Sequence, residues 1–157
     1  MTMFTFGYEG VSIDAFIARL KKANVHSVLD VRELPLSRKR GFSKKSFADA
    51  LNEAGIVYAH LPIFGCPKKI RNRYKADGNW PAYVKAFDTY LAGQKEAVAV
   101  LAHFANKTNA CLVCFEADFN QCHRSMVARA AARVGGFRVA HLTITEEIPD
   151  VAFQVAA

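Results

Sequence analysis

The sequence predicts an α/β fold of three layers, in which a mostly parallel central sheet of about five strands has helices on both faces. Short apolar runs of strand length alternate along the chain with segments whose apolar residues recur at helical spacing. Most of these runs lack a polar face, as is typical of strands inside a parallel sheet. Regular alternation favours a parallel sheet, because each parallel strand needs a crossover connection, usually a helix.

Five short apolar segments are predicted to be the strands, at residues 3–7, 25–31, 56–61, 110–115 and 137–142. Ser12 and Ser43 are suitable N-caps for two predicted helices, the second of which ends at Gly55. An apolar stripe from Pro81 to residue 105 crosses Gly93, and one kinked helix or two short helices explain it equally well. The last predicted helix covers residues 121–134.

The length and composition suit one domain. The chain has 157 residues, of which 52% are hydrophobic, so a single continuous core over residues 1–157 is expected. Residues 62–81 are basic and contain several prolines and glycines, which predicts a loop in which only residues 69–75 form a helical turn. A loop of this length is usually functional or mobile. From residue 143 onward we expect a flexible tail.

The N-terminal sequence and the cysteines predict a cytoplasmic protein with reduced thiols and no membrane partner. The first residues lack the features of a signal peptide, and no apolar stretch is long enough to span a membrane. Cys111 and Cys114 form a Cys-x-x-Cys, but residues three apart on a strand point to opposite faces, so Cys111 is assigned to the core. No histidine has a metal-ligand spacing from the cysteines, so no metal site is expected from them.

Polar residues follow the predicted strands at the edge where open parallel sheets bind their ligands. They come from segments far apart in the sequence, and we expect the fold to bring them together. In chain order they are Tyr8, Asp30, Arg32, Glu116, Asp118, Cys122, His123 and Arg124.

Cys122 is the candidate nucleophile of this set. If Asn120 caps the helix, Cys122 lies in its first turn, where unpaired N–H groups and the helix dipole favour a thiolate and would also bind an anion. An inert, half-buried thiol explains the same residue. Adjacent helical positions diverge by about 100°, so His123 is expected to lie at the surface or to form hydrogen bonds rather than to activate Cys122.

The acidic residues have two interpretations. The favoured one is a structural ion pair, in which Arg32 or Arg124 neutralises Asp30 at the end of an apolar strand. In the other, Asp30, Glu116 and Asp118 bind Mg²⁺ for phosphoryl chemistry. No cofactor is expected under the favoured interpretation, and Mg²⁺ is the one that the other interpretation would require.

Positive charge is concentrated in the middle of the chain. The formal net charge is +7, and residues 38–75 contain ten Lys and Arg but only two acidic residues. A solvated surface explains this charge, and so does an anionic partner such as a nucleic acid or a nucleotide. Aromatic residues nearby could stack on bases. The candidate nucleic-acid contacts are Lys68, Lys69, Arg71 and Arg73, and the candidate anion contacts are Tyr8, Arg32, Arg38, His123 and Arg124.

Three blocks of the sequence resemble one bacterial and archaeal family. The blocks are FTFGYEG, DVRELPLSRKRGFSK and LVCFEADFNQCHRSMVA, and the match runs from about Phe4 to His141. They are similar to the family known as domain of unknown function 488. The resemblance implies a compact α/β domain without an established reaction. It singles out Gly7, Asp30, Arg32, Pro35, Arg38, Glu116, Cys122, His123 and Arg124. One departure is Cys66, which stands where the family has a Gly-Gly turn.

The favoured hypothesis is an enzyme of unassigned reaction that binds a phosphate-bearing ligand, either nucleic acid or a nucleotide. Its candidate catalytic residues are Cys122, Glu116 and Asp30. The alternative is a non-catalytic module that binds nucleic acid or protein, in which the acidic and arginine residues brace the fold. A thiol-dependent phosphatase or sulfurtransferase fits less well, because the sequence after Cys122 is short for a loop that cradles an anion.

Overall fold

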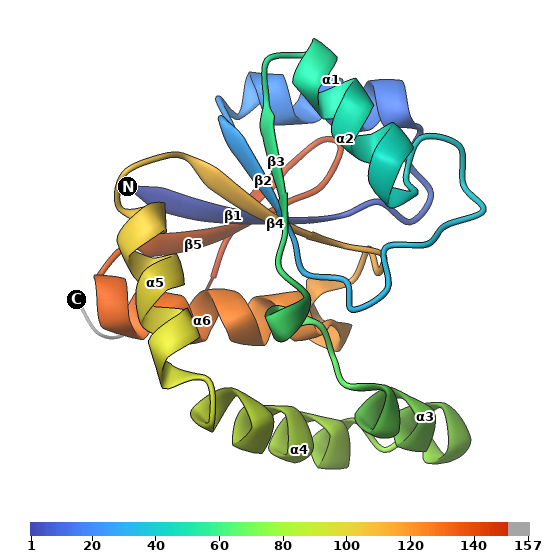
Figure 1. Cartoon of the computed structure of the whole chain (residues 1–157), viewed down its shortest axis with the longest axis vertical. Helices are drawn as coiled ribbons and strands as arrows, with labels where there is room; N and C mark the ends of the chain where they lie inside the picture. Colours follow the sequence, from blue (N-terminus) through green and yellow to red (C-terminus); the bar gives the residue numbers. More distant parts are fainter. Residues whose placement is uncertain (151–157) are drawn as a thin grey trace.

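A six-stranded sheet forms the centre of the computed structural model, which describes residues 1–150 (Figure 1). The strands are β1 (Thr2–Gly7), β2 (Ser27–Asp30), β3 (Val57–His60), β4 (Ala110–Cys114), β5 (Arg138–Leu142) and β6 (Glu147–Pro149). Their order in space is β3-β2-β4-β1-β5-β6. All neighbouring strands are parallel except β6, which is antiparallel to β5. The predicted α/β class with a mostly parallel sheet is confirmed.

Helices and two 3₁₀ turns connect the strands. The α-helices are α1 (Ile13–Lys22), α2 (Lys44–Glu53), α3 (Lys68–Asp77), α4 (Trp80–Ala92), α5 (Lys95–Ala105) and α6 (His123–Gly135), and the 3₁₀ turns are η1 (Pro62–Phe64) and η2 (Phe119–Gln121). Ser12 caps α1 as predicted, since its hydroxyl accepts a hydrogen bond from the Ala15 N–H at 3.2 Å. Over residues 1–150, none of the helices combines the length and the hydropathy needed to cross a membrane.

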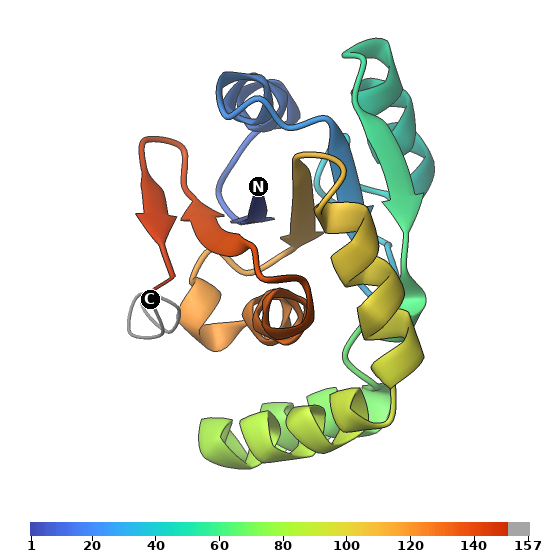
Figure 2. The same ribbon diagram turned by 90° about the vertical axis from the view of Figure 1, so that its left-hand side faces the viewer.

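Helices cover both faces of the sheet (Figures 1 and 2), and each face has its own core. Phe16 of α1 and Phe47 of α2 are buried on one face, and Phe87 of α4 is buried on the other, where α5 and α6 also pack. The two cysteines of the Cys-x-x-Cys lie on opposite sides, with Cys111 in the first core and Cys114 in the second. The prediction that this pair does not converge is therefore confirmed.

The segment 62–81 contains more helix than the sequence predicts. The expectation of a loop with a helical turn at 69–75 is wrong, because α3 has ten residues and ends at Gly78 in the left-handed region, with φ 63°. No residue of α3 is fully buried, and only Ile70 and Tyr74 pack against the core. So few apolar residues give a weak helical period, and the helix depends on packing against α4.

Two more elements are clarified by the structure. The apolar stripe across Gly93 belongs to two helices, α4 and α5. The expected flexible tail is wrong for residues 147–149, which form β6 and pair with β5, while residues 151–157 lie outside the described residues. The sequence did not indicate β6 because the strand has three residues and one is proline, which is uncommon inside sheets.

A buried polar network connects β1, β5 and the residue that follows β6. His141 of β5 is fully buried, and its Nδ1 lies 2.6 Å from the hydroxyl of Thr5, its neighbour on β1. Its Nε2 lies 3.3 Å from Asp150, which also binds Arg129 at 2.8 Å. A neutral ring with its proton on Nε2 suits both partners, because it donates to Asp150 and accepts from Thr5.

Protonation of His141 should destabilise the protein in mild acid. Burial lowers the pKa of His141 to about 4, although Asp150 opposes the shift. The unfolded chain, in which the pKa is about 6.5, therefore binds a proton first as the pH falls. We expect the free energy of unfolding, measured by urea denaturation, to fall by roughly 2–3 kcal/mol between pH 7 and pH 4.5 through this residue.

Matched variants isolate the effect. Gln can donate to Asp150 and accept from Thr5 without titrating. His141→Gln should therefore reduce the change in the free energy of unfolding between pH 7 and pH 4.5 by that amount. His103→Gln, at an exposed position of α5, should not change it. An unaltered pH dependence in His141→Gln would contradict the assignment.

Candidate functional site

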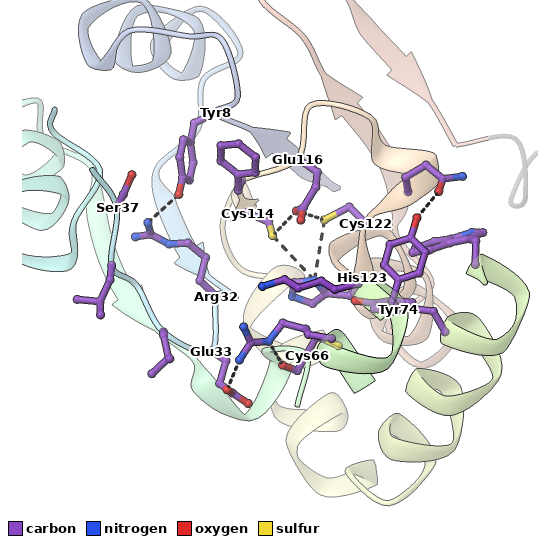
Figure 3. Close-up of a pocket in the computed structure, with 18 of the residues that line it drawn as sticks. Tyr8, Arg32, Glu33, Ser37, Cys66, Tyr74, Cys114, Glu116, Cys122 and His123 are labelled. Carbon is purple, nitrogen blue, oxygen red and sulfur yellow. Dashed lines mark hydrogen bonds and ion pairs between the residues drawn. The ribbon is translucent and has the colours of Figure 1, made fainter. Parts of the chain in front are cut away.

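A cavity of about 520 Å³ opens at the carboxyl ends of β1, β2 and β4, where the sequence predicts the site (Figure 3). Its lining comes from the loop after β2, from one side of α3, from the start of α4, and from the connection between β4 and α6. Cavities of this size are typical of small-molecule sites.

Four polar side chains lie together at the bottom of the cavity, and we call them the thiol floor: Cys114, Glu116, Cys122 and His123. Oε2 of Glu116 lies 3.1 Å from Sγ of Cys114 and 3.4 Å from Sγ of Cys122. Nδ1 of His123 lies 3.9 Å from each of these sulfur atoms (Figure 3). The fold thus brings together a cysteine from the end of β4 and two residues from the start of α6.

The backbone at the start of α6 explains why the side chains of Cys122 and His123 both lie near Sγ of Cys114. Cys122 is the N-cap of α6, with extended backbone at φ −141° and ψ 138°, and His123 is the first helical residue. The predicted cap, Asn120, is instead part of η2, which Asp118 caps through a hydrogen bond to the Asn120 N–H. The helical divergence of about 100° therefore does not apply between Cys122 and His123, which is why their contact was missed.

The ring of His123 is held from its other side. Nε2 lies 2.7 Å from the carbonyl oxygen of Val31, just after β2, and the ring packs edge-on against Phe87 with 5.4 Å between centroids. Of the two roles predicted for His123, at the surface or in hydrogen bonds, the structure supports the second, because the side chain is buried. A carbonyl oxygen can only accept a hydrogen bond, so Nε2 carries a proton that it donates to Val31. The other ring nitrogen, Nδ1, faces the two sulfur atoms.

The close packing of the thiol floor shifts the pKa values of its members. The hydrogen bond with Cys122 and then burial raise the pKa of Cys114 well above its usual range. Burial opposes ionisation of Cys122 as well, but its hydrogen bond with Cys114, the charge of Arg124 and His123 lower its pKa well below the usual range. Burial and the charge of Cys122 raise the pKa of Glu116. The isolated floor therefore favours one thiolate, on Cys122.

The backbone that carries Glu116 lies directly against β1. A Cβ atom at Gly7 would lie 1.8 Å from the carbonyl oxygen of Glu116, so this close approach requires glycine. Arg124, a predicted anion contact, is fully buried and does not line the cavity. Its guanidinium donates to the carbonyl oxygens of Glu116 and Ala117. It therefore holds this loop in place instead of facing a ligand.

Asp30 and Arg32 form a buried ion pair beside the cavity, which confirms the structural interpretation of these residues. Nε and Nη2 of Arg32 donate to the two carboxylate oxygens of Asp30 at 2.8 and 2.7 Å. Nη1 donates to the Tyr8 hydroxyl at 3.2 Å and to the Phe42 carbonyl at 2.6 Å, and Tyr58 donates to Asp30 at 2.6 Å. Among residues 1–150, these bonds leave one of the five N–H groups of Arg32 for a ligand.

The three carboxylates considered for Mg²⁺ do not converge. Asp30 is fully buried and held by Arg32, Glu116 faces the two thiols, and Asp118 is exposed and caps η2. In the part of the chain that the structure describes, Cys114, Cys122 and His123 are the one group of three or more side chains with the spacing of metal ligands.

Basic residues surround the opening of the cavity, and we call Arg38, Arg71 and Lys75 the basic rim. Arg38 and Lys75 are exposed, while Arg71 is half-buried and binds Glu33 at 2.7 Å. Of the four residues predicted to contact nucleic acid, only Arg71 lines this cavity. The others are exposed on α3, outside the cavity: Lys68, Lys69 and Arg73.

Aromatic side chains form one wall of the cavity, and we call Tyr74, Trp80 and Tyr83 the aromatic wall. Trp80 stacks on Tyr83 with 4.6 Å between centroids, and Tyr74 packs against both rings. Cys66, buried beside the wall, lines the cavity too. Cys66 and Cys114 were not predicted to be site residues, although the position of Cys114 at a strand end, on the face opposite Cys111, was a usable signal.

Loss of Arg32 should strongly destabilise the fold. Arg32→Met leaves the carboxylate of Asp30, which is 0% exposed, without its cation. We expect the free energy of unfolding, measured by urea denaturation, to fall by about 3–5 kcal/mol. The double variant Asp30→Asn/Arg32→Met should be more stable than Arg32→Met, because no buried charge remains.

Arg38→Met is the matched control, since it removes the same charge from an exposed position and should change stability by about 0.5 kcal/mol or less. If Arg32→Met is no less stable than Arg38→Met, the ion pair does not support the fold.

Comparisons with known proteins identify a family for this chain. A family model described as "Domain of unknown function DUF488" matches residues 12–131. Searches of curated proteins and of solved structures found no match. The matched segment contains the whole thiol floor, the basic rim and the aromatic wall. Since it covers well over half of the sequence, the chain belongs to the DUF488 family.

Proposed function

We propose that the protein is an enzyme that binds a phosphate-bearing ligand of nucleotide size and acts on it at the thiol floor. One observation carries the proposal: a single cavity combines the basic rim, the aromatic wall and the thiol floor. The rim supplies positive charge, the wall supplies flat apolar surface, and the floor supplies reactive groups.

The basic rim supports phosphate binding. Arg71 is held in place by Glu33 and by the carbonyl of Cys66, at 3.0 Å from Nε, so its position is defined before a ligand arrives. Lys75 lies one turn beyond Arg71 on α3, Arg38 comes from the loop after β2, and both are exposed. Arg and Lys bind phosphate oxygens through charge-assisted hydrogen bonds, which are stronger than neutral ones.

The aromatic wall and the cavity volume favour a nucleotide over a long nucleic acid. Stacking of a base on an aromatic ring contributes about 1–3 kcal/mol. A cavity of about 520 Å³ falls in the range of small-molecule sites, whereas a nucleic acid would extend along the outer side of α3. The basic residues expected for that contact, Lys69 and Arg73, lie outside the cavity.

The thiol floor supports an enzyme rather than a binding module. A bracing network explains Asp30 and Arg32, but it does not explain why two cysteines, a histidine and a carboxylate face one cavity. Cys122 and Glu116 remain the candidate catalytic residues. Asp30 does not line the cavity, so it acts through Arg32 as a positioning residue.

Binding can be measured through the single tryptophan of the chain, Trp80, because it lies in the aromatic wall. We expect nucleoside mono- or diphosphates to quench its fluorescence in a saturable way. Arg38→Ala/Lys75→Ala should weaken the binding by about 10- to 100-fold, because each lost cation removes a charged hydrogen bond.

The matched control is Lys69→Ala/Arg73→Ala, which removes the same charge from exposed positions on α3 outside the cavity. Its affinity should stay within about twofold of the parent protein. The absence of saturable quenching with every nucleotide, or equal weakening in both double variants, would refute the proposal. Binding of a single-stranded oligonucleotide that depends on Lys69 and Arg73 alone would favour the binding module.

A further inference from the structure

We propose that Cys114, Cys122 and His123 bind a divalent metal ion that prefers sulfur ligands, of the Zn²⁺ class, with its fourth coordination position open to the cavity. The role of this ion in a reaction rests on the proposed function, whereas its binding does not. This site was not expected from the sequence, because Cys114 and Cys122 come from separate elements and have no familiar spacing.

The positions of the three ligand atoms fit a tetrahedral ion. Zinc lies about 2.3 Å from a thiolate sulfur and about 2.0–2.1 Å from a histidine nitrogen, which places the sulfur and nitrogen atoms of one site about 3.6 Å apart. Nδ1 of His123 lies 3.9 Å from Sγ of Cys114 and from Sγ of Cys122. All three atoms lie within 4.8 Å of one another, so small side-chain adjustments suffice.

The orientation of His123 is that of a metal ligand. Its Nε2 lies 2.7 Å from the Val31 carbonyl, which leaves Nδ1 directed at the two sulfur atoms (Figure 3). Histidines that bind metals almost always donate the other ring N–H to a carbonyl or a carboxylate, which fixes the ring and the tautomer. Packing against Phe87 restrains the same ring.

Burial and charge also favour a divalent ion. Cys122, Cys114 and His123 are 2%, 4% and 6% exposed, so the ligands lie in a site with little water. Two thiolates balance the charge of one divalent ion, whereas two buried thiolates beside Glu116 without an ion would repel each other. Oε2 of Glu116 contacts both sulfur atoms and can accept the remaining thiol proton, that of Cys114, as the ion binds, before this proton passes to solvent.

The open fourth position is what connects the ion with the cavity. Structural zinc sites use four protein ligands, whereas catalytic sites use three and leave one position for water or substrate. All three ligands line the cavity, as does Glu116, whose Oε2 contacts both sulfur atoms. An ion here would therefore face a ligand held by the basic rim.

A disulfide between Cys114 and Cys122 is the competing use of the two thiols. It would need an oxidant, and it would give no role to a histidine nitrogen equidistant from both sulfur atoms. In the structure both cysteines are free, without a disulfide between them. The two outcomes are distinguishable, because oxidation removes thiols that titrate with Ellman's reagent under denaturing conditions.

The test uses Co²⁺ as a visible probe of Zn²⁺ sites. The full chain, reduced and stripped with a chelator, is titrated with Co²⁺ in the absence of nucleotide. We expect saturation at one ion per chain, with the visible bands of tetrahedral Co²⁺ and a sulfur-to-metal charge-transfer band, and displacement of the colour by Zn²⁺. Wild-type protein that gives no such bands while all four thiols still titrate would overturn the proposal.

Four alanine variants locate the site. Cys114→Ala and Cys122→Ala should lose the charge-transfer band, whereas Cys66→Ala, in the same cavity, and Cys111→Ala, in the opposite core, should keep it. His123→Gln should weaken Co²⁺ binding by about 10-fold or more. Circular dichroism checks that each variant folds. Loss of the band in Cys66→Ala or Cys111→Ala, or its retention in Cys114→Ala and Cys122→Ala, would overturn the assignment. Since no nucleotide is present, failure here is independent of the nucleotide-binding test.

Discussion

The buried ion pair between Asp30 and Arg32 is the interaction on which one side of the cavity depends. A carboxylate at the end of a buried strand is stable only if a cation and hydrogen bonds satisfy it, and Arg32 supplies both. The same guanidinium reaches the Tyr8 hydroxyl after β1 and the Phe42 carbonyl before α2. One side chain thus ties together the ends of two strands and the loop that carries Arg38. Its role is to shape the site more than to bind a ligand.

A second set of contacts positions the chain between β4 and α6. Because Gly7 of β1 has no side chain, this connecting segment can lie close to β1, and Arg124 donates a hydrogen bond to the backbone carbonyl of Glu116. His123 is fixed by the carbonyl of Val31, so the start of α6 is tied to the end of β2. These contacts leave the reactive atoms little freedom, and such preorganised groups are typical of functional sites.

The cavity joins parts that a purely structural explanation would not place together. The basic rim and the aromatic wall suit a phosphate-bearing ligand with a flat ring, and the thiol floor suits either thiolate or metal chemistry. The low pKa of Cys122 and the geometry of a metal site have a common origin, since both arise from a histidine and a second sulfur packed around one thiol. Membership of the DUF488 family assigns the chain to a group of proteins but assigns no reaction to it.

Local patterns in the sequence were enough for β1 to β5, for most of the helices and for the edge of the sheet where polar residues gather, because burial imposes its period on each segment. They also indicated the Asp30–Arg32 pair, whose members are two residues apart. They failed for α3, where few apolar residues reveal the period, and for the roles of Cys114 and Arg124. Only the tertiary structure decided which side chains meet. The extended backbone of Cys122 at the start of α6 turns its side chain toward Cys114 of β4, and periodicity does not encode such a contact.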